Sequence, residues 1–319
     1  MSDPKLFHKL KALLQHHILG QEGLVDSLIM SLLADGHLLV EGAPGLAKTK
    51  AISTLANYLE ADFQRIQFTP DLLPSDITGT EIFRPQTGEF IFQQGPVFHN
   101  LVLADEINRA PAKVQAALLE AMAERQVSAG GETRDLPNLF LVMATQNPIE
   151  QEGTYPLPEA QLDRFLMHVI VDYPSAEAEL EILRTVRKES LAQPTQDQPR
   201  LNQQSIFQAR AQAMQVTMTP AVESYIVELV QATRAPSRYS NNLADAIVFG
   251  ASPRASIALD KCSRVKAWLD GRDYVTPADI QKLAPSILRH RIGLSFAALA
   301  QGYTPTKVVD ELLLLVTTP

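Results

Sequence analysis

The feature that most constrains this chain is an eight-residue segment of small residues that ends in Lys-Thr: Gly42, Ala43, Pro44, Gly45, Leu46, Ala47, Lys48 and Thr49. It follows a short apolar run and opens a stretch with helical periodicity, which is the context that a phosphate-binding loop requires. Small residues let backbone N–H groups surround phosphates, and the start of the helix adds favourable partial charge. Lys48 can reach the β and γ phosphates of ATP, and Thr49 can ligate Mg²⁺.

The loop departs from the general pattern at Ala47, where glycine is usual. A methyl group is tolerated there if the residue already has helical backbone angles. The substitution weakens the match to the general motif when the loop is considered by itself.

Paired carboxylates follow a second apolar run, 101–104, about fifty residues further on. Asp105 is placed to hold Mg²⁺ through its water shell, as the acidic residue at the end of the neighbouring strand does in nucleoside triphosphatases with such a loop. Glu106 can then act as the base that orients and polarises the attacking water. The next apolar run ends at Asn147, whose amide can hold that water or the γ phosphate. Asn147-Pro148 could instead be a turn that only ends the strand.

Short apolar runs alternate with helical stretches over the first half of the chain, which predicts an α/β fold with a parallel five-stranded sheet. The alternating pattern at 63–68 places that strand nearer an edge. After Tyr173-Pro174 only helical periodicity remains, so the sequence predicts two domains, 1–174 and an all-helical 175–319. Two segments, at about 82–98 and 127–137, interrupt the alternation and are expected to be β-hairpins.

Composition limits the possible partners. The 319 residues carry a formal net charge of −8, which disfavours a grip on a nucleic-acid backbone. No apolar run is long enough to cross a bilayer and no signal-peptide pattern is present, so we expect a cytoplasmic protein without membrane insertion. The single cysteine, Cys262, falls at helix-core spacing and is expected to be a small buried hydrophobe. The cluster 289–291 (Arg-His-Arg) is typical of a solvated helix end.

Five motifs occur together and in order: 42–49, 105–111 (Asp-Glu-Ile-Asn-Arg-Ala-Pro), 144–148, 157–165 (Leu-Pro-Glu-Ala-Gln-Leu-Asp-Arg-Phe) and 250–255 (Gly-Ala-Ser-Pro-Arg-Ala). Over about residues 18 to 290, the chain resembles the MoxR branch of AAA+ ATPases, a branch related to the magnesium-chelatase AAA subunit. Alanine at position 47 is usual in that branch.

The resemblance implies a P-loop AAA+ core followed by a helical lid domain. It implies that Asn147 is the first sensor, Arg164 the arginine finger and Arg254 the second sensor on the lid. A guanidinium suits charge that spreads over a transferring phosphoryl group. Read from the residues alone, Asp163-Arg164 could equally be an ion pair at a helix end. A cation at a helix start, as at Arg254, opposes the helix dipole and indicates a compensating anion such as a phosphate.

The family likeness also assigns Gly20 and Gln21 to the segment beside the adenine base, although Gly20 could instead be a simple turn between helices. It makes 82–98 an insertion in the second helix and 127–137 the hairpin before the first sensor. The implied assembly is a homo-hexameric ring that remodels or activates a protein complex, often with a von Willebrand factor A (VWA) domain partner on a separate chain.

Two other functions remain open from the sequence. One is a helicase or nucleic-acid translocase, because neighbouring AAA+ branches include such motors; the acidic composition argues against it. The other is a non-hydrolysing nucleotide switch. The combination of Asp105, Glu106, Asn147 and Arg164 argues against that alternative, because a switch has no need of hydrolytic groups.

Overall fold

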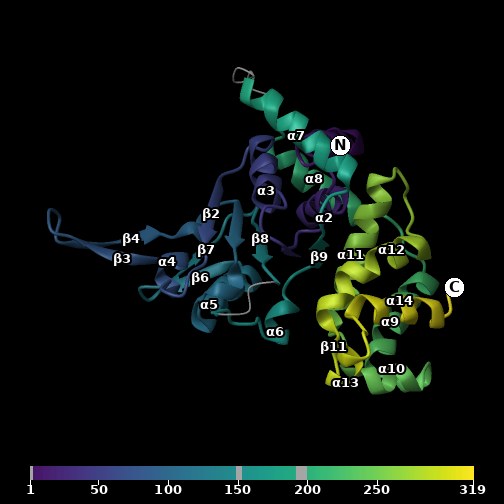
Figure 1. Cartoon of the computed structure of the whole chain (residues 1–319). Helices are drawn as coiled ribbons and strands as arrows, with labels where there is room; N and C mark the ends of the chain where they lie inside the picture. The colour runs from purple at the N-terminus through teal and green to yellow at the C-terminus, as the bar shows by residue number, and fades with distance from the viewer. Residues whose placement is uncertain (1–2, 149–152, 192–199) are drawn as a thin grey trace. The chain divides into compact units, whose positions relative to one another are not determined.

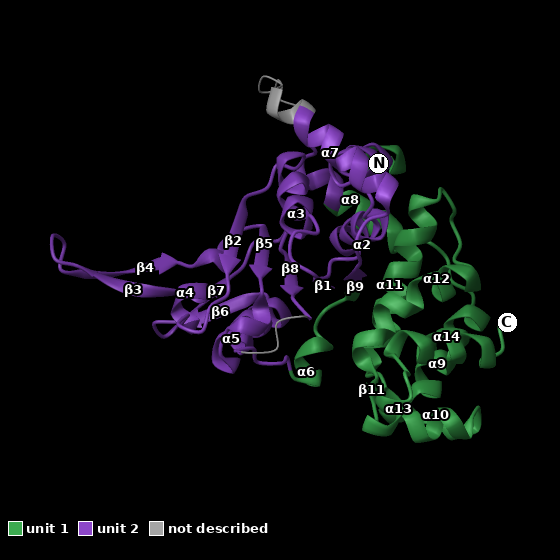
Figure 2. Ribbon diagram, in the orientation of Figure 1, with its two compact units in different colours: residues 1–7, 158–168, 207–319 green, residues 8–157, 169–206 purple. Residues whose placement is uncertain are grey.

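The computed structural model describes residues 3–148, 153–191 and 200–319. The described chain forms two compact units (Figure 2), each made of separate stretches of sequence. The sheet unit takes residues 8–157 and 169–206, and the helical unit takes 1–7, 158–168 and 207–319. The sequence predicts one domain boundary, between residues 174 and 175, whereas each compact unit consists of several separate stretches of the chain. The segment that carries Arg164 therefore belongs to the helical unit.

The sheet unit is built on five strands in the order β2-β5-β8-β1-β9. Their bounds are β1 Leu38–Gly42, β2 Phe63–Gln67, β5 Leu101–Asp105, β8 Leu141–Gln146 and β9 Met167–Val171. The pairs β2–β5, β5–β8 and β8–β1 are parallel. Strand β5 is buried along its whole length and β2 lies at the edge with an uneven burial pattern. The predicted five-stranded α/β sheet is thus confirmed, and the alternating segment is the edge strand.

Helices connect these strands (Figure 1). They are α1 Pro4–His17, which begins in the helical unit, α2 Glu22–Leu33, α3 Lys48–Asn57, α4 Pro74–Thr78, α5 Ala112–Glu124 and α7 Ala176–Leu191, with the 3-10 turns η1 Pro96–Phe98 and η2 Ile107–Arg109. Apolar residues from several of these helices, including Leu28, Ile52 and Leu118, are fully buried in the unit. Their burial removes apolar surface from water and is the main stabilising contribution to the unit.

Two antiparallel hairpins interrupt the α/β alternation. Strand β3 (Gly79–Arg84) pairs with β4 (Glu89–Gln94), and β6 (Gln126–Ala129) pairs with β7 (Glu132–Asp135). In Figure 1 the β3–β4 hairpin extends from the sheet unit as a long arm. Its exposed aromatic rings, Phe83 and Phe90, contact each other with centroids 5.2 Å apart. The arm therefore presents apolar surface away from the core of its unit.

The helical unit contains α6 Glu159–Leu162, most of α8 Gln203–Ala213, α9 Pro220–Arg234, η3 Pro236–Arg238, α10 Asn241–Ala246, α11 Pro253–Leu269, α12 Pro277–Leu288, η4 Arg289–Arg291, α13 Phe296–Ala300, α14 Pro305–Leu315 and the short pair β10 Ile247–Phe249 with β11 Gly293–Leu294. Several helices start with Ser or Thr followed by proline, because the hydroxyl satisfies a free N–H and proline suits the first turn. Ser252 before α11 and Thr219 before α9 both accept a backbone hydrogen bond in this way.

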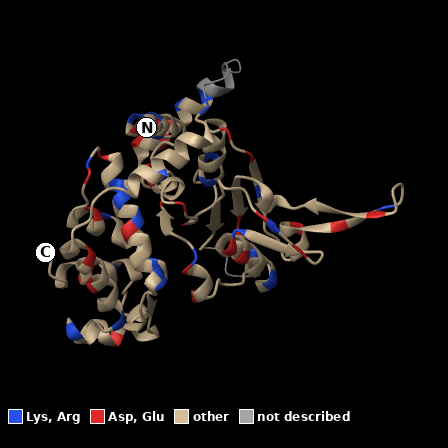
Figure 3. Ribbon diagram, turned by 180° about the vertical axis from the view of Figure 1, so that it is seen from behind, with Lys and Arg blue, Asp and Glu red and all other residues tan. Residues whose placement is uncertain are grey.

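Cys262 lies inside the helical unit and is completely buried, as its helix-core spacing predicted. Burial raises the pKa of its thiol to about 12. Charged residues of both signs are interspersed along both units (Figure 3), and some form ion pairs inside the helical unit, such as Arg272 with Asp279. None of the helices in the described ranges is long and apolar enough to span a bilayer.

Candidate functional site

A cavity of about 410 Å³ opens in the sheet unit where strands β2, β5 and β8 end. Its lining combines the phosphate-loop candidates with the residues that follow the central strands: Pro44, Gly45, Leu46, Ala47, Lys48, Thr49, Lys50, Arg65, Gln67, Asp105, Glu106 and Asn147. The structure therefore brings Lys48, Thr49, Asp105, Glu106 and Asn147 to one pocket, although the sequence scatters them over a hundred residues.

The loop between β1 and α3 forms one wall of this pocket. At Gly42 a Cβ atom would lie 2.6 Å from the carbonyl oxygen of Val171, so the position admits only glycine. The buried Lys48 donates a hydrogen bond to the Gly42 carbonyl. Burial lowers the pKa of Lys48, while the nearby carboxylates of Asp105, Glu106 and Glu41 oppose that shift. The ammonium group thus lies at the base of the loop, surrounded by acceptors.

Ala47 has left-handed backbone angles, φ 57° and ψ 13°. The condition of right-handed helical angles, under which the methyl group is easily tolerated, is therefore not met at this position. Glycine adopts this region freely, whereas an L-residue with a Cβ is strained there by roughly 1–2 kcal/mol. The left-handed turn lets the chain enter α3 directly after the loop, so the strain lies within the phosphate-binding candidate itself.

Asp105 is the last residue of β5 and is held on both carboxylate oxygens. Its Oδ1 accepts a hydrogen bond from Thr145 Oγ1 at 2.7 Å, and its Oδ2 accepts from Arg65 Nε at 3.1 Å and Nη2 at 2.7 Å. Thr145 lies on the neighbouring strand β8 and also accepts the backbone N–H of Glu106 at 2.9 Å. The carboxylate is therefore fixed by the two strands that flank β5.

Glu106 follows β5 in a left-handed conformation with φ 56° and has a half-buried side chain. Its Oε2 accepts hydrogen bonds from Gln67 Nε2 and from Arg109 Nη1, each at 2.9 Å. Gln67 is the residue of β2 in register with Asp105. One carboxylate is thus held in a defined orientation by an amide and a guanidinium, as a group that must aim at a water requires.

Arg65, Gln67, Arg109 and Thr145 form this support. Arg109 and Thr145 lie in the motifs 105–111 and 144–148 but were given no role from the sequence, and Arg65 and Gln67 were not singled out. Arg65 and Gln67 share one face of β2 because side chains alternate along a strand. Two polar residues on the edge strand were a signal, but only the strand order puts them beside β5. Thr145 was visible as a polar residue ending an apolar run.

The side chains of the pocket suit a triphosphate with Mg²⁺. A small-residue loop and an ammonium group match phosphate, and a hydroxyl with a carboxylate supplies the oxygen ligands that Mg²⁺ prefers. Mg²⁺ is usually bound by one or two carboxylates together with substrate phosphates, and Asp105 with Thr49 fits that pattern. Within the described residues, no group of three or more His, Cys, Asp or Glu side chains is placed to hold a metal ion.

Gly20 and Gln21 lie against the segment after β9. Gly20 has φ +73°, and a Cβ there would come within 3.1 Å of Pro174 and Ala178 side chains. Gln21 Nε2 donates to the carbonyl oxygen of Asp172 at 2.8 Å. A second cavity, of about 180 Å³, has Asp172 in its lining and shares Gly42, Ala43 and Leu46 with the phosphate loop. The expected adenine-side segment thus contacts a residue that borders a cavity next to the loop.

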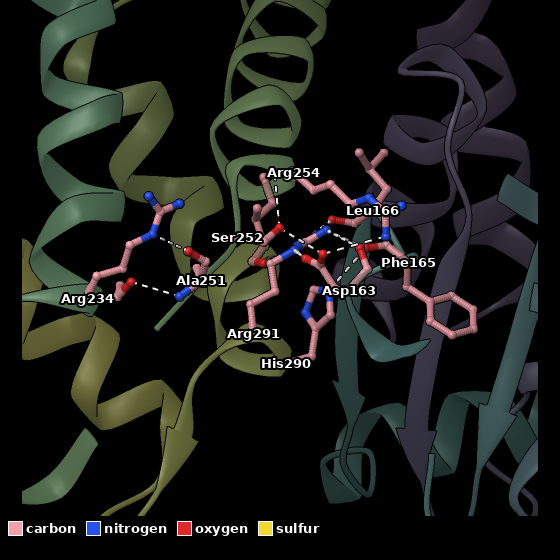
Figure 4. Close-up of polar contacts among 11 residues, drawn as sticks. Asp163, Phe165, Leu166, Arg234, Ala251, Ser252, Arg254, His290 and Arg291 are labelled. Atoms are coloured by element: carbon pink, nitrogen blue, oxygen red, sulfur yellow. Dashed lines mark hydrogen bonds and ion pairs between the residues drawn. The ribbon is translucent and has the colours of Figure 1, made fainter. Parts of the chain in front are cut away.

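Arg164 and Arg254 both belong to the helical unit. Arg164 follows α6, and Arg254 is the second residue of α11 (Figure 4). Asp163 directly precedes Arg164. Its Oδ2 lies 3.7 Å from Arg254 Nη1 and accepts a hydrogen bond from Ser252 Oγ at 2.8 Å. The anion near the start of α11 that the helix dipole indicated is, within this unit, the Asp163 carboxylate.

The cluster 289–291 is not a solvated helix end. His290 and Arg291 are only 8% and 5% exposed. Burial lowers the pKa of His290 well below 6.5, with the charge of Arg291 as a second cause. Arg291 forms an ion pair with Asp163, Nε to Oδ1, at 2.8 Å. A short run of charged residues has the same sequence pattern whether solvent or protein surrounds it. Here other residues of the helical unit bury His290 and Arg291.

Comparisons with known proteins agree with this geometry. The family described as "ATPase family associated with various cellular activities (AAA)" matches residues 37–167, and the AAA lid domain matches 240–312. "Chaperone MoxR1" of Mycobacterium tuberculosis is 48% identical over 303 residues, covering 95% of this chain and 79% of that protein. "Protein MoxR" of Methylorubrum extorquens is 33% identical over 291 residues, covering 87% and 84%.

A crystal structure of a protein from Cytophaga hutchinsonii has the same fold, with a TM-score of 0.92 and 44% sequence identity; the match covers 99% of this chain and 96% of that one. An AAA ATPase domain implies nucleotide binding, and the side chains that line the 410 Å³ pocket suit a nucleotide. The matched residues include the loop, both carboxylates and the helices that follow Arg254. The chain belongs to the MoxR family of AAA+ ATPases.

Proposed function

We propose that this protein is a Mg-ATP-hydrolysing motor that assembles as a homo-hexameric ring and remodels or activates a protein complex. The single observation that supports hydrolysis best is the shared pocket of Lys48, Thr49, Asp105, Glu106 and Asn147. A site for binding alone needs the loop and the ammonium group. The second carboxylate, held by two donors at the pocket wall, is a group that hydrolysis uses and simple binding does not.

In this proposal the backbone from Gly42 to Ala47 cradles the phosphates and Lys48 neutralises the β and γ groups. Thr49 and Asp105 hold Mg²⁺, Asp105 through the water shell. Glu106 accepts the proton of the attacking water while Asn147 holds that water or the γ phosphate. Gly20 and Gln21 border the base. The ion supplies charge neutralisation on the phosphates when it is bound.

Arg164 is proposed as a finger that acts on the nucleotide of a neighbouring subunit, and Arg254 as the second sensor. A finger of this kind typically contributes about 10³ to 10⁵ in rate. It also makes turnover depend on assembly, which is why a ring follows. The similarity to a protein named as a chaperone supports a remodelling role. We also propose a VWA-domain protein as the partner, as the family resemblance implies.

Glu106→Gln tests the hydrolytic assignment. The amide keeps the size and the hydrogen-bond reach of the side chain but cannot accept the proton, so turnover should fall by about 10² to 10⁴. ATP affinity, measured by calorimetry, should be unchanged. Glu120→Gln, at an exposed position of α5, is the matched control and should keep wild-type turnover. Normal turnover of Glu106→Gln would remove Glu106 as the base.

The ATP-trapped Glu106→Gln protein also identifies the partner. Bound to ATP, it should retain a protein complex on an affinity matrix better than the ADP form does. DNA or RNA that stimulates the wild-type ATPase with steep salt dependence would instead indicate a nucleic-acid motor. Absence of any turnover in the assembled wild-type ring would indicate a nucleotide switch.

A further inference from the structure

The helical unit contains a buried arginine that the proposed chemistry does not use. Arg291 ends η4, and its side chain is 2% exposed. Burying a guanidinium removes it from water at considerable cost, and apolar residues of similar volume often stabilise a core as well or better. The fixed charge inside this unit therefore invites a functional explanation, which its hydrogen bonds provide.

Most of the hydrogen bonds of Arg291 end on residues 163–166. Its Nε donates to Asp163 Oδ1 at 2.8 Å, and Nη2 donates to the Phe165 carbonyl at 2.6 Å and to the Asp163 carbonyl at 3.4 Å. Nη1 donates to the Leu166 carbonyl at 3.3 Å, and the remaining bond anchors it to the Ile287 carbonyl of α12. One guanidinium group thus donates hydrogen bonds to backbone carbonyls on both sides of Arg164.

A neighbouring side chain contacts the same stretch of backbone. His290 Nε2 lies 3.1 Å from the Phe165 carbonyl oxygen, and the Phe165 ring is completely buried. The backbone at 165 is therefore anchored by two side chains of η4 and by its own ring. Arg164 lies between two fixed points, so its Cα has little freedom to move relative to α12.

The Asp163 carboxylate connects these hydrogen bonds to the start of α11. While Oδ1 accepts from Arg291, Oδ2 accepts from Ser252 Oγ at 2.8 Å and lies 3.7 Å from Arg254 Nη1 (Figure 4). Ser252 is the N-cap of α11, and its Oγ accepts the backbone N–H of Arg254 at 3.1 Å. A chain of contacts therefore runs from Arg291 through one carboxylate to Arg254.

Helix α9 holds the other side of this cap. Arg234 Nε donates to the Ala251 carbonyl at 2.6 Å, and the Ala251 N–H donates to Thr233 Oγ1 at 2.9 Å. Gly250 packs so closely that a Cβ would lie 2.4 Å from the Thr233 carbonyl oxygen. The segment before Arg254 is thus fixed from two directions, by α9 and by Asp163.

We infer that Arg291 and Asp163 are positioning residues that hold Arg164 and Arg254 in a fixed relation to each other, so that the two arginines act as one unit. The inference rests on the proposed function, because it assumes that Arg164 and Arg254 act on nucleotide. Lysine could not replace Arg291, since an ammonium group lacks the planar fork that reaches the carboxylate and several carbonyls together.

The main test uses the double variant Asp163→Asn/Arg291→Gln, which removes both charges and leaves neither one buried alone. We expect ATP turnover to fall by about 10²-fold, the size of effect that a small misplacement of a reacting group produces. The dissociation constant for ATP, set mainly by the loop in the sheet unit, should change much less. Circular dichroism gives the folded fraction used to correct both values.

Arg272→Gln/Asp279→Asn is the matched control. It removes another Arg–Asp pair of the helical unit, with Nη2 and Oδ1 2.6 Å apart, whose other hydrogen bonds involve Asp270, Tyr274 and Thr276. It should lose stability but keep wild-type turnover per folded molecule. Arg291→Lys keeps a charge beside Asp163 and guards against misfolding of the double variant; it should still turn over more slowly than wild type.

Adding Arg164→Ala and Arg254→Ala to the double variant separates positioning from a purely structural role. If Arg291 and Asp163 act through these two arginines, the quadruple variant should be no slower than Arg164→Ala/Arg254→Ala. Multiplying losses would overturn the inference, as would turnover of Asp163→Asn/Arg291→Gln or Arg291→Lys equal to that of the control. Wild-type turnover of Arg164→Ala would instead refute the finger itself, so the two failures are distinguishable.

Discussion

The smallest unit of this site is a carboxylate held from two sides. The Glu106 carboxylate accepts hydrogen bonds from the Gln67 amide and the Arg109 guanidinium. The neighbouring Asp105 carboxylate accepts hydrogen bonds from Arg65 and Thr145. Each acid has different donors, but the two sets are linked because Arg65 Nη2 also donates to Gln67 Oε1 at 2.8 Å. One hydrogen-bond network therefore sets the orientations of both carboxylates.

Gln67→Ala should expose the importance of this orientation. The variant removes one of the two donors to Glu106, so we expect turnover to fall by roughly tenfold, within the range that small misplacements produce. ATP affinity should stay the same because the loop and Lys48 are untouched. Gln64→Ala on the same strand, whose amide donates to the Arg65 carbonyl instead, is the control. Equal turnover of the two variants would contradict the role of Gln67.

At the level of elements, the start of α12 shows how one carboxylate organises a helix end. Asp279 Oδ2 accepts the Thr276 N–H and hydroxyl, each at 2.8 Å, and both Asp279 oxygens accept from Arg272. Burial by itself raises the pKa of Asp279, but the hydrogen bonds from Arg272 and Thr276 outweigh it and lower the pKa below 3.8. The ionised form is therefore favoured in the folded state.

This shift predicts acid sensitivity. Because the folded pKa is lowered, Asp279 contributes stability above the ordinary pKa of 3.8, and the contribution is lost as the pH falls through the lower folded value. Asp279→Asn should reduce the free energy of unfolding by about 2 kcal/mol near pH 7, and less at pH 3. Urea unfolding between pH 3 and 7 measures both values. Asp310→Asn, at an exposed position of α14, should show no such loss.

How far the sequence predicts these elements depends on what each one needs. Strands β5 and β8 were predictable because continuous apolar runs carry their own signal, and Asp105 followed because it ends such a run. The role of Arg65 was not predictable, since its contact with Asp105 depends on β2 lying beside β5. Strand order is a property of the whole sheet. Arg291 was misread because burial is decided by residues more than a hundred positions away.

The whole molecule divides the proposed chemistry between its two units. The phosphate loop and both carboxylates belong to the sheet unit, whereas Arg164 and Arg254 belong to the helical unit. Turnover should therefore require intact groups from both, even though each unit has its own buried core. If the finger acts between subunits, the two sets need not come from the same chain.

Mixing two inactive variants tests that division. Glu106→Gln retains Arg164, and Arg164→Ala retains Glu106, so a mixed ring contains interfaces with both groups intact. We expect the mixture to regain ATPase activity that neither protein shows alone, and to do so only at concentrations where subunits associate. Activity of the mixture equal to the mean of its separate components would contradict a finger supplied by a neighbour.

The complete burial of Cys262 has a practical consequence for labelling the protein at a chosen position. A thiol that is shielded from water and held protonated reacts very slowly with alkylating dyes, because the thiolate is the nucleophile. A cysteine introduced at the tip of the β3–β4 arm, for example Phe90→Cys, would then take the fluorophore selectively, without prior removal of the native thiol. The same silent thiol would report local opening of the helical unit, since it becomes reactive only when its surroundings separate.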